Sequence, residues 1–286
     1  MTTPDPVLAL QRQFTALQRL NIVYFILAVL ALVLCFVEPN YALITLFASL
    51  ILRQTLGRKK NREYETGMIH VSVLKTLQRY LENPQHRHTS IWTVQEIRDV
   101  RFLPSNAASG SILCREGATG TYHGRNVTLG DVTLAHTFTV NNKKSHNFVV
   151  GCWITVSLET DTGLDCRFIG ENMVPSQSLK EMLWVESDLK QIGKPMLLKS
   201  DWKVVCAEDN QVMPEEGFLV QLDDLHKKTG GESAVCVQGN RLHILLKGDI
   251  LARSISRRTP PAPQLEHIDL LSNLPYALLL SDLLNT

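Results

Sequence analysis

A long apolar run near the start of the sequence restricts the fold of this chain more than any other feature. Residues 20–37, LNIVYFILAVLALVLCFV, contain seventeen apolar side chains out of eighteen. As a helix this segment rises about 27 Å, which matches the hydrocarbon core of a bilayer. The alternative is a cleaved signal peptide, but nineteen residues precede the run, and VEPNY follows it without a small-x-small cleavage site. The run therefore predicts a retained membrane anchor.

A second, shorter apolar run follows at residues 41–52, YALITLFASLIL. Twelve residues are too few to span a bilayer alone, so a buried core helix or a re-entrant segment is the alternative. The Pro-Asn pair between the two runs favours a turn. Because the side chain of Arg53 is long enough to reach the interface, the second helix can extend further. We expect a transmembrane hairpin with spans at about 20–37 and 41–57, with a single span as the alternative.

The basic residues predict the orientation of this hairpin. They flank both apolar runs, whereas the connecting loop carries only Glu38, so the positive-inside rule places both termini in the cytoplasm. We interpret the basic cluster after the second run as a determinant of topology. A more specific interpretation is that these basic side chains bind anionic lipid headgroups. The flanking basic residues are Arg12 and Arg19 before the first run, and Arg53, Arg58, Lys59, Lys60 and Arg62 after the second.

Charge and cysteine usage exclude some classes of protein. Residues 1–62 hold seven of the 29 Lys and Arg and two of the 28 Asp and Glu, which leaves 22 basic and 26 acidic residues, net −4, in the remainder. A mildly acidic region is a poor binder of nucleic acid, because neutralising phosphates needs a basic face. The six cysteines are widely spaced and form no C-x-x-C pair. This pattern predicts free thiols in a reducing compartment.

The residues after the apolar runs predict an α+β fold. An amphipathic helix over 63–83 is indicated by apolar side chains at helical spacing, and Pro84 is expected to end it. From about 90 to 172 the pattern changes to short, alternating runs rich in β-branched residues, which is typical of an antiparallel meander. Within it, residues 120–136, GTYHGRNVTLGDVTLAH, alternate between apolar and polar side chains.

The last third of the chain mixes helices and strands. We expect a helix over 176–192, a strand over 202–206, and a helix from about 214 to 228. A hairpin is predicted around the Gly239-Asn240 turn. The chain then ends in a leucine-rich amphipathic helix, interrupted near Pro275, that either packs on the domain or lies on the bilayer surface.

The predicted fold class is therefore α+β, with an N-terminal transmembrane helical hairpin followed by a cytoplasmic domain of mainly antiparallel sheet and packed helices. The sequence divides into five predicted segments. They are a cytoplasmic N-terminal segment (1–19), the transmembrane hairpin (20–57), a connecting amphipathic helix (58–83), the cytoplasmic α+β domain (84–258), and a linker with the C-terminal amphipathic helix (259–286).

This layout resembles a bacterial family without an assigned activity, the domain-of-unknown-function family 3137. The resemblance covers most of residues 20–286. It lies in the order of the predicted elements, because none of the matching stretches is a specific catalytic motif. It implies a bacterial inner-membrane protein with a cytoplasmic α+β domain, and it carries no functional residues across. The stretches that carry it are VLKTLQRYLENP, GTYHGRNVTLGDVTLAH with the strand FVVGCWITV, WKVVCAEDNQVMPEEGFLVQLDDLHKKTGG, and the C-terminal leucine-rich helix.

Several common catalytic and cofactor motifs are absent from the sequence, which lowers the case for an enzyme without excluding one. It contains no P-loop, no dinucleotide-binding glycine pattern, no H-E-x-x-H and no G-x-S-x-G. His86-x-His88 is the nearest pair of metal ligands, but it lies in a polar stretch without a third ligand close in sequence. We interpret these histidines as solvent-exposed, and the cysteines in strand-like runs as buried small residues. We therefore expect neither a metal nor a cofactor.

Two functional classes remain. The first is a non-enzymatic binding or scaffold module, tethered to the lipid bilayer, with an unidentified protein partner. The second is a membrane-tethered enzyme, most plausibly a hydrolase, that uses polar residues of 120–136. Its candidate catalytic residues are His123, Arg125, Asp131 and His136. Convergence of these side chains in a concave pocket favours the enzyme, whereas their separation across a sheet favours the binding module.

Overall fold

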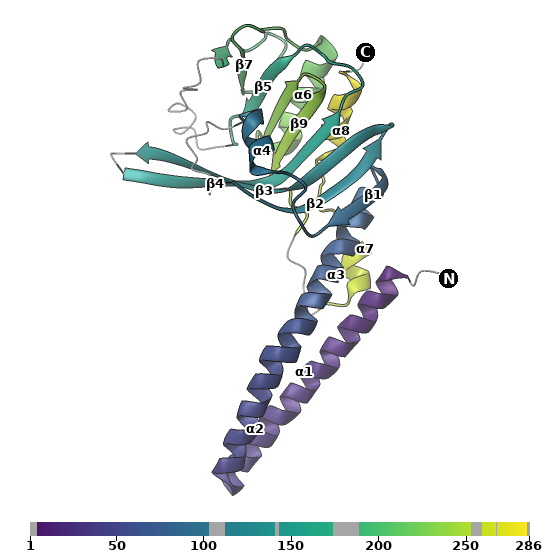
Figure 1. The fold of residues 1–286 in the computed structure, drawn as a ribbon, viewed down its shortest axis with the longest axis vertical. Helices are drawn as coiled ribbons and strands as arrows, with labels where there is room; N and C mark the ends of the chain where they lie inside the picture. The colour runs from purple at the N-terminus through teal and green to yellow at the C-terminus, as the bar shows by residue number, and fades with distance from the viewer. Residues whose placement is uncertain are drawn as a thin grey trace. The chain divides into compact units, whose positions relative to one another are not determined.

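The structure is a computed structural model and describes residues 5–102, 112–140, 143–173, 189–252, 259–266 and 268–284, without the side chains of 136–147. The chain divides into two compact units. The helical unit comprises residues 1–75 and 253–268, and the sheet unit comprises residues 76–252 and 269–286. Figure 1 shows the elements of both units, and each unit is described by itself below.

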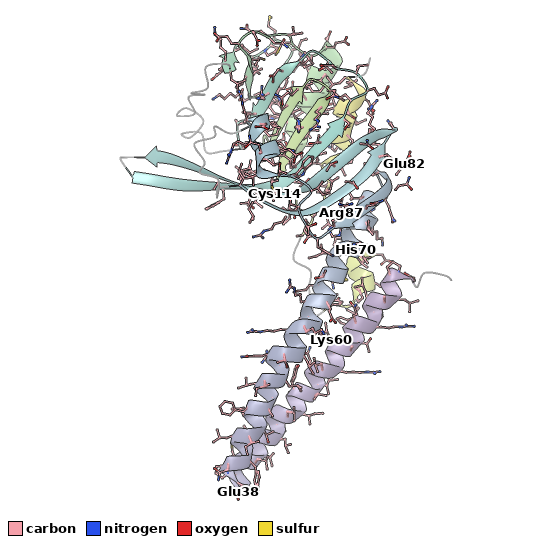
Figure 2. The ribbon with its side chains drawn as sticks, in the orientation of Figure 1. Glu38, Lys60, His70, Glu82, Arg87 and Cys114 are labelled. Carbon is pink, nitrogen blue, oxygen red and sulfur yellow. The ribbon has the colours of Figure 1, made fainter. Side chains whose placement is uncertain are left out.

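The helical unit consists of three longer helices, a short π-helical turn and one short helix in the described residues. Its first two helices lie side by side. The Tyr24 hydroxyl, near the middle of the first helix, donates a hydrogen bond to the Leu52 carbonyl at the end of the second, at 3.1 Å. Figure 2 shows Glu38 at the junction between these helices. The elements are α1 (Pro6–Val37), α2 (Pro39–Leu52), the π-helical turn η1 (Arg53–Gly57), α3 (Arg58–Leu77, of which residues 58–75 belong to this unit) and α7 (Pro261–Glu266).

The two ends of α1 differ in their surroundings. Within the described part of the chain, α1 is the one helix long and apolar enough to cross a membrane, and 6% of its most apolar window is buried. Large side chains such as Phe25 and Phe36 are exposed on it. Nearer its start, Leu10 and Leu17 pack with Tyr64 and Met68 of α3 into a small core, which α7 completes through a further leucine. The apolar helix predicted at the N-terminal end is thus present.

The sheet unit is built on one antiparallel sheet. Every strand pair in the described residues is antiparallel, and the spatial order is β1-β2-β3-β4-β9-β8-β5-β7-β6. The predicted α+β class with a large antiparallel sheet is confirmed. The strands are β1 (Glu82–Arg87), β2 (Ile112–Tyr122), β3 (Arg125–Val140), β4 (Lys143–Ser157), β5 (Asp165–Gly170), β6 (Leu189–Ile192), β7 (Trp202–Ala207), β8 (Ser233–Gln238) and β9 (Arg241–Lys247).

Helices cover both faces of this sheet. On one face, α4 (Val94–Val100) packs into a core that contains Trp153 and Ile169. Because side chains alternate along a strand, Phe168 points to the other face, where its ring lies 6.2 Å from that of Phe218 in α6 (Glu216–Thr229). The buried side of α8 (Leu274–Asp282) packs beside α6. The sheet is therefore the middle layer of the unit, as Figure 1 shows.

Several local predictions are confirmed and have a clear physical cause. The helix expected at 214–228 is α6, and Gly230 ends it in the left-handed conformation, with φ of 60°. The hairpin at Gly239-Asn240 joins β8 to β9. Of the two alternatives for the C-terminal helix, the structure shows packing on the domain, because Leu274, Ala277 and Leu278 of α8 are buried.

Other local predictions are wrong. The connecting helix ends at Leu77 rather than at the proline, and residues 82–87 form the edge strand β1 instead of a polar loop. An edge strand tolerates Pro84, because one side of its backbone needs no ladder hydrogen bonds. The predicted helix 176–192 ends in a strand, β6, and its residues 176–188 lie outside the described residues. The C-terminal helix is two helices, α7 and α8, and the break near Pro275 lies before this proline, which is the second residue of α8.

Candidate functional site

Residues 120–136 form two strands joined by a tight turn. Tyr122 at the end of β2 pairs with Arg125 at the start of β3, which leaves His123 and Gly124 as the turn. Both turn residues have positive φ, 48° and 81°. This geometry matches the right-handed twist of a hairpin, and glycine at the second position adopts it without strain. The turn therefore projects His123 from the end of the hairpin, where its side chain is 63% exposed.

Three side chains around this turn converge on one carboxylate of α8. The Tyr122 hydroxyl donates to Asp282 Oδ2 at 2.9 Å, and Arg125 Nη1 donates to Asp282 Oδ1 at 2.7 Å. His123 Nδ1 lies 3.2 Å from the same Oδ1, and its ring stacks on that of Tyr122 with centroids 4.1 Å apart. Arg125 also donates to the Ser281 hydroxyl at 3.1 Å. We call Tyr122, His123, Arg125 and Asp282 the helix clasp.

The electrostatics of the helix clasp favour the ionised form of Asp282, and both of its carboxylate oxygens accept hydrogen bonds. Burial raises the pKa of Asp282, but hydrogen bonds from Arg125, Tyr122 and His123 outweigh it and hold that pKa below its usual value. Burial, together with the neighbouring carboxylate, raises the pKa of Tyr122 to about 12. The phenol therefore stays protonated at neutral pH and acts as a hydrogen-bond donor. The Asp282 carboxylate and the Tyr122 phenol are thus both engaged in hydrogen bonds within the clasp.

The other two candidate residues do not join the helix clasp. Asp131 is buried, and its two oxygens accept hydrogen bonds from the backbone N–H groups of Leu251 and Ala252, at 2.6 and 2.9 Å. Burial raises the pKa of Asp131, and these two hydrogen bonds oppose the shift. The side chain of His136 lies outside the described residues. The structure thus brings together His123 and Arg125, and it gives Asp131 a separate role in holding the segment after β9.

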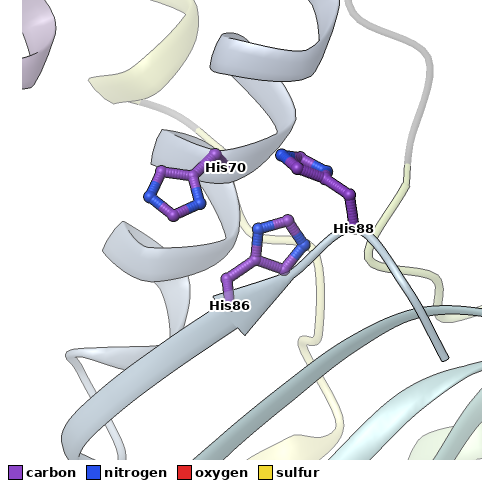
Figure 3. Close-up of side chains that lie close together, drawn as sticks. All are labelled: His70, His86 and His88. Atoms are coloured by element: carbon purple, nitrogen blue, oxygen red, sulfur yellow. The ribbon is translucent and has the colours of Figure 1, made fainter. Parts of the chain in front are cut away.

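A second polar cluster lies at the β1 edge of the sheet. The side chain of His86 is fully buried, with 0% exposed, and its Nε2 lies 2.9 Å from Glu116 Oε2. His88 Nδ1 lies 3.0 Å from the same oxygen, and the two imidazole rings are 4.7 Å apart and edge-on. Figure 3 shows these two imidazoles; His70, also labelled there, lies on α3 of the helical unit. The interpretation of both histidines as solvent-exposed loop residues is therefore wrong for His86.

Local backbone features place Glu116 in this cluster. The β2–β3 register shifts between Cys114 and Gly117, so that two residues of β2 face one of β3 in a β-bulge. Such a bulge redirects the side chains of the extra residues. Gly117 lets the segment after β1 pass close by, because a Cβ there would lie 2.5 Å from the Ile91 side chain. Sequence reasoning missed Glu116 because it lies 28 residues from His88 and reaches it only through strand pairing.

The basic residues that follow the apolar runs lie on the helical unit. Arg58, Lys59 and Arg62 line an open groove together with Gln13 of α1 and Thr66 of α3. Their neighbour Lys60 pairs with Glu63 at 3.2 Å, and Figure 2 labels Lys60 on α3. Arg53 lies on η1, at the end of the second apolar run. Positive charge is thus concentrated directly beyond the apolar helices.

The thiols of Cys152 and Cys236 are unsuited to nucleophilic chemistry, whereas a hydrogen bond with Cys166 lowers the pKa of Cys206. Cys152, Cys166, Cys206 and Cys236 are buried and free. Burial raises the pKa of Cys236 to about 12 and raises that of Cys152 well above the usual value. A thiol with a raised pKa carries little of the reactive thiolate at neutral pH.

Comparison with known proteins identifies no family. No family model matches the chain, and no curated protein matches its sequence. Among solved structures, the chain is similar to the crystal structure of the mycobacterial trehalose monomycolate transport factor A, TtfA. The identity is 11%, the TM-score is 0.37, and the alignment covers 76% of this chain and 94% of that chain. A likeness this weak carries no functional argument.

Proposed function

We propose that this chain is a bacterial inner-membrane protein whose sheet unit is a non-enzymatic binding or scaffold module in the cytoplasm. The observation that carries this proposal is the helix clasp. Of the candidate catalytic residues whose side chains the structure describes, His123 and Arg125 are engaged in holding α8, and Asp131 is engaged in holding residues 251 and 252. The resemblance to domain-of-unknown-function family 3137 agrees with this setting and stays a prediction.

The membrane setting rests on α1 and α2. We propose that they form a hairpin with spans at about 20–37 and 41–57, with both termini in the cytoplasm. Many large apolar side chains of both helices are exposed, as expected for surfaces that face lipid. The second helix passes without interruption through η1 into α3, so the fourteen residues of α2 do not limit the length of the span. The basic residues beyond it support the orientation.

The sheet unit also exposes an apolar row that supports binding of a protein partner. Leu113 of β2 and Val150 of β4 both pair with Thr133, and all three lie in one line across the sheet. Phe148 lies two residues further along β4, on the same face as Val150. Leu113, Phe148 and Val150 are 46%, 60% and 42% exposed. Contiguous exposed apolar side chains of this kind mark interaction surfaces, so we propose a partner protein with an apolar contact surface.

Site-specific photocrosslinking in cells tests this proposal. We expect a photoreactive residue at Phe148 to give a discrete adduct with another protein. Val150→Ser in the same protein should abolish that adduct, and Phe148→Ser alone should abolish the cellular phenotype at normal abundance. Val220 on α6 is the matched control, because it is also apolar and 51% exposed. A phenotype lost in a folded His123→Ala protein that still forms the adduct would instead support the hydrolase alternative.

A further inference from the structure

The cluster at the β1 edge has the composition and spacing of a metal-binding site. Two imidazole nitrogens, Nε2 of His86 and Nδ1 of His88, face a single carboxylate oxygen of Glu116 at 2.9 and 3.0 Å. Two histidines and one carboxylate are an established ligand set for Zn²⁺ and for other divalent transition metals. We propose that His86, His88 and Glu116 bind a divalent transition-metal ion of the Zn²⁺ type.

The observed distances are close to those of a metal complex. With metal–ligand bonds of about 2.0–2.2 Å in a tetrahedral arrangement, neighbouring ligand atoms lie about 3.3–3.5 Å apart. Each nitrogen therefore needs to move away from the carboxylate oxygen by about half an ångström. Side-chain rotation of Glu116 and His88 supplies this opening without a change in strand pairing, because both side chains are partly exposed, at 16% and 38%.

The strand geometry holds the three ligands in place beforehand. The two histidines are separated by one residue, so they project from the same face of the chain at the end of β1. The bulge in β2 supplies Glu116, and the register brings His86 opposite Ala118, two residues from that glutamate. His86 is buried, whereas His88 is the most exposed of the three. The ion would thus enter from the His88 side and keep a water at its remaining position.

Zinc binding to the full chain in detergent or nanodiscs tests the proposal. The protein is purified with a tag that contains no histidine, treated with a chelator, and titrated with Zn²⁺ in competition with a chromogenic chelator. We expect one Zn²⁺ per chain and a higher thermal unfolding temperature with the ion. Cobalt should give the visible absorption bands of a four-coordinate nitrogen and oxygen site.

Two variants separate a ligand site from adventitious binding. Glu116→Gln keeps the shape of the side chain, and His88→Ala removes the most exposed ligand. Each should weaken Zn²⁺ binding by about tenfold or more, since loss of even an outer-shell partner costs about 10–100-fold. His226→Ala is the matched control, because His226 pairs with Glu171 as an isolated histidine and carboxylate. Binding should be unchanged in it.

The outcome that overturns the proposal is equally specific. If the wild-type chain binds Zn²⁺ no more tightly than folded Glu116→Gln, the cluster is only a hydrogen-bonded link between strands. Circular dichroism establishes that each variant is folded, and if His88→Ala unfolds, Glu116→Gln decides. The result is independent of whether the sheet unit binds a protein, because crosslinking at Phe148 involves different residues.

Discussion

At the residue scale, the sheet unit buries several polar side chains and pairs some of them across strands. His243 of β9 is 6% exposed, and its Nδ1 lies 2.9 Å from the Thr155 hydroxyl. Burial lowers the pKa of His243 to about 4, and the positive charges of Arg241 and Arg167 lower it further. The imidazole is therefore neutral in the folded protein throughout the physiological pH range.

This neutral histidine predicts a loss of stability in mild acid. An unfolded His243 binds a proton near pH 6.5, whereas the folded one does so only near pH 4, so acid favours the unfolded chain across that window. The full contribution is present above pH 6.5 and should fall by about 2 kcal/mol between about pH 7.5 and about pH 5. We expect His243→Gln to flatten this slope in urea unfolding followed by tryptophan fluorescence. An equal slope in both proteins would show that His243 does not contribute.

At the element scale, α8 is held to the sheet by both apolar and charged contacts. Leu274, Ala277 and Leu278 supply the buried apolar side, and Asp282 supplies the acceptor for the helix clasp. Hydrogen bonds to a charged group contribute about 1.5–3 kcal/mol each, so the clasp contributes much to the attachment of α8.

Asp282→Asn is expected to loosen α8. Asparagine offers one acceptor oxygen in place of two and no charge, so it cannot satisfy Tyr122 and Arg125 together. The free energy of unfolding should fall by about 1.5–3 kcal/mol, with faster hydrogen exchange in α8. Asp201→Asn is the control, because Asp201 is 84% exposed and its ion pair with Lys194, at 3.6 Å, is a weak surface contact. This substitution should change the free energy of unfolding little. Similar losses in both variants would contradict the role of the clasp.

The sequence predicts elements best where a local signal is strong. Gly230 marks the end of α6 and the Gly239-Asn240 pair marks the β8–β9 turn, because glycine adopts a positive φ without strain. The edge strands β1 and β6 are not predicted from the sequence. Their extended conformation depends on pairing with a neighbouring strand rather than on the pattern of apolar and polar residues within them.

The same reason limits prediction of the candidate site. His123 and Arg125 are identifiable from composition, but their partner Asp282 is about 160 residues away in the chain. Glu116 is likewise brought to His86 and His88 by strand pairing and a bulge, neither of which the alternating pattern reveals. Long-range pairing therefore decides which polar residues meet, and a single sequence contains little information about it.

At the scale of the whole molecule, the apolar helices and the basic residues beyond them predict one arrangement across the membrane. In a Cys35→Ala background, an impermeant maleimide should label Asn40→Cys in intact cells, because the junction of α1 and α2 then faces outward. Asn61→Cys should be labelled only after the membrane is opened. Labelling of Asn61→Cys in intact cells would contradict the two-span topology.

The attachment of α8 also sets an order of events during synthesis. All nine strands of the described sheet lie between Glu82 and Lys247, whereas α8 begins at Leu274. A ribosome therefore completes the sheet before it releases the helix that satisfies Tyr122 and Arg125. The apolar helices α1 and α2 are therefore synthesised first, and the sheet lacks this cover until α8 follows. Until residue 282 has left the ribosome, Tyr122 and Arg125 of the nascent sheet lack their acceptor on α8.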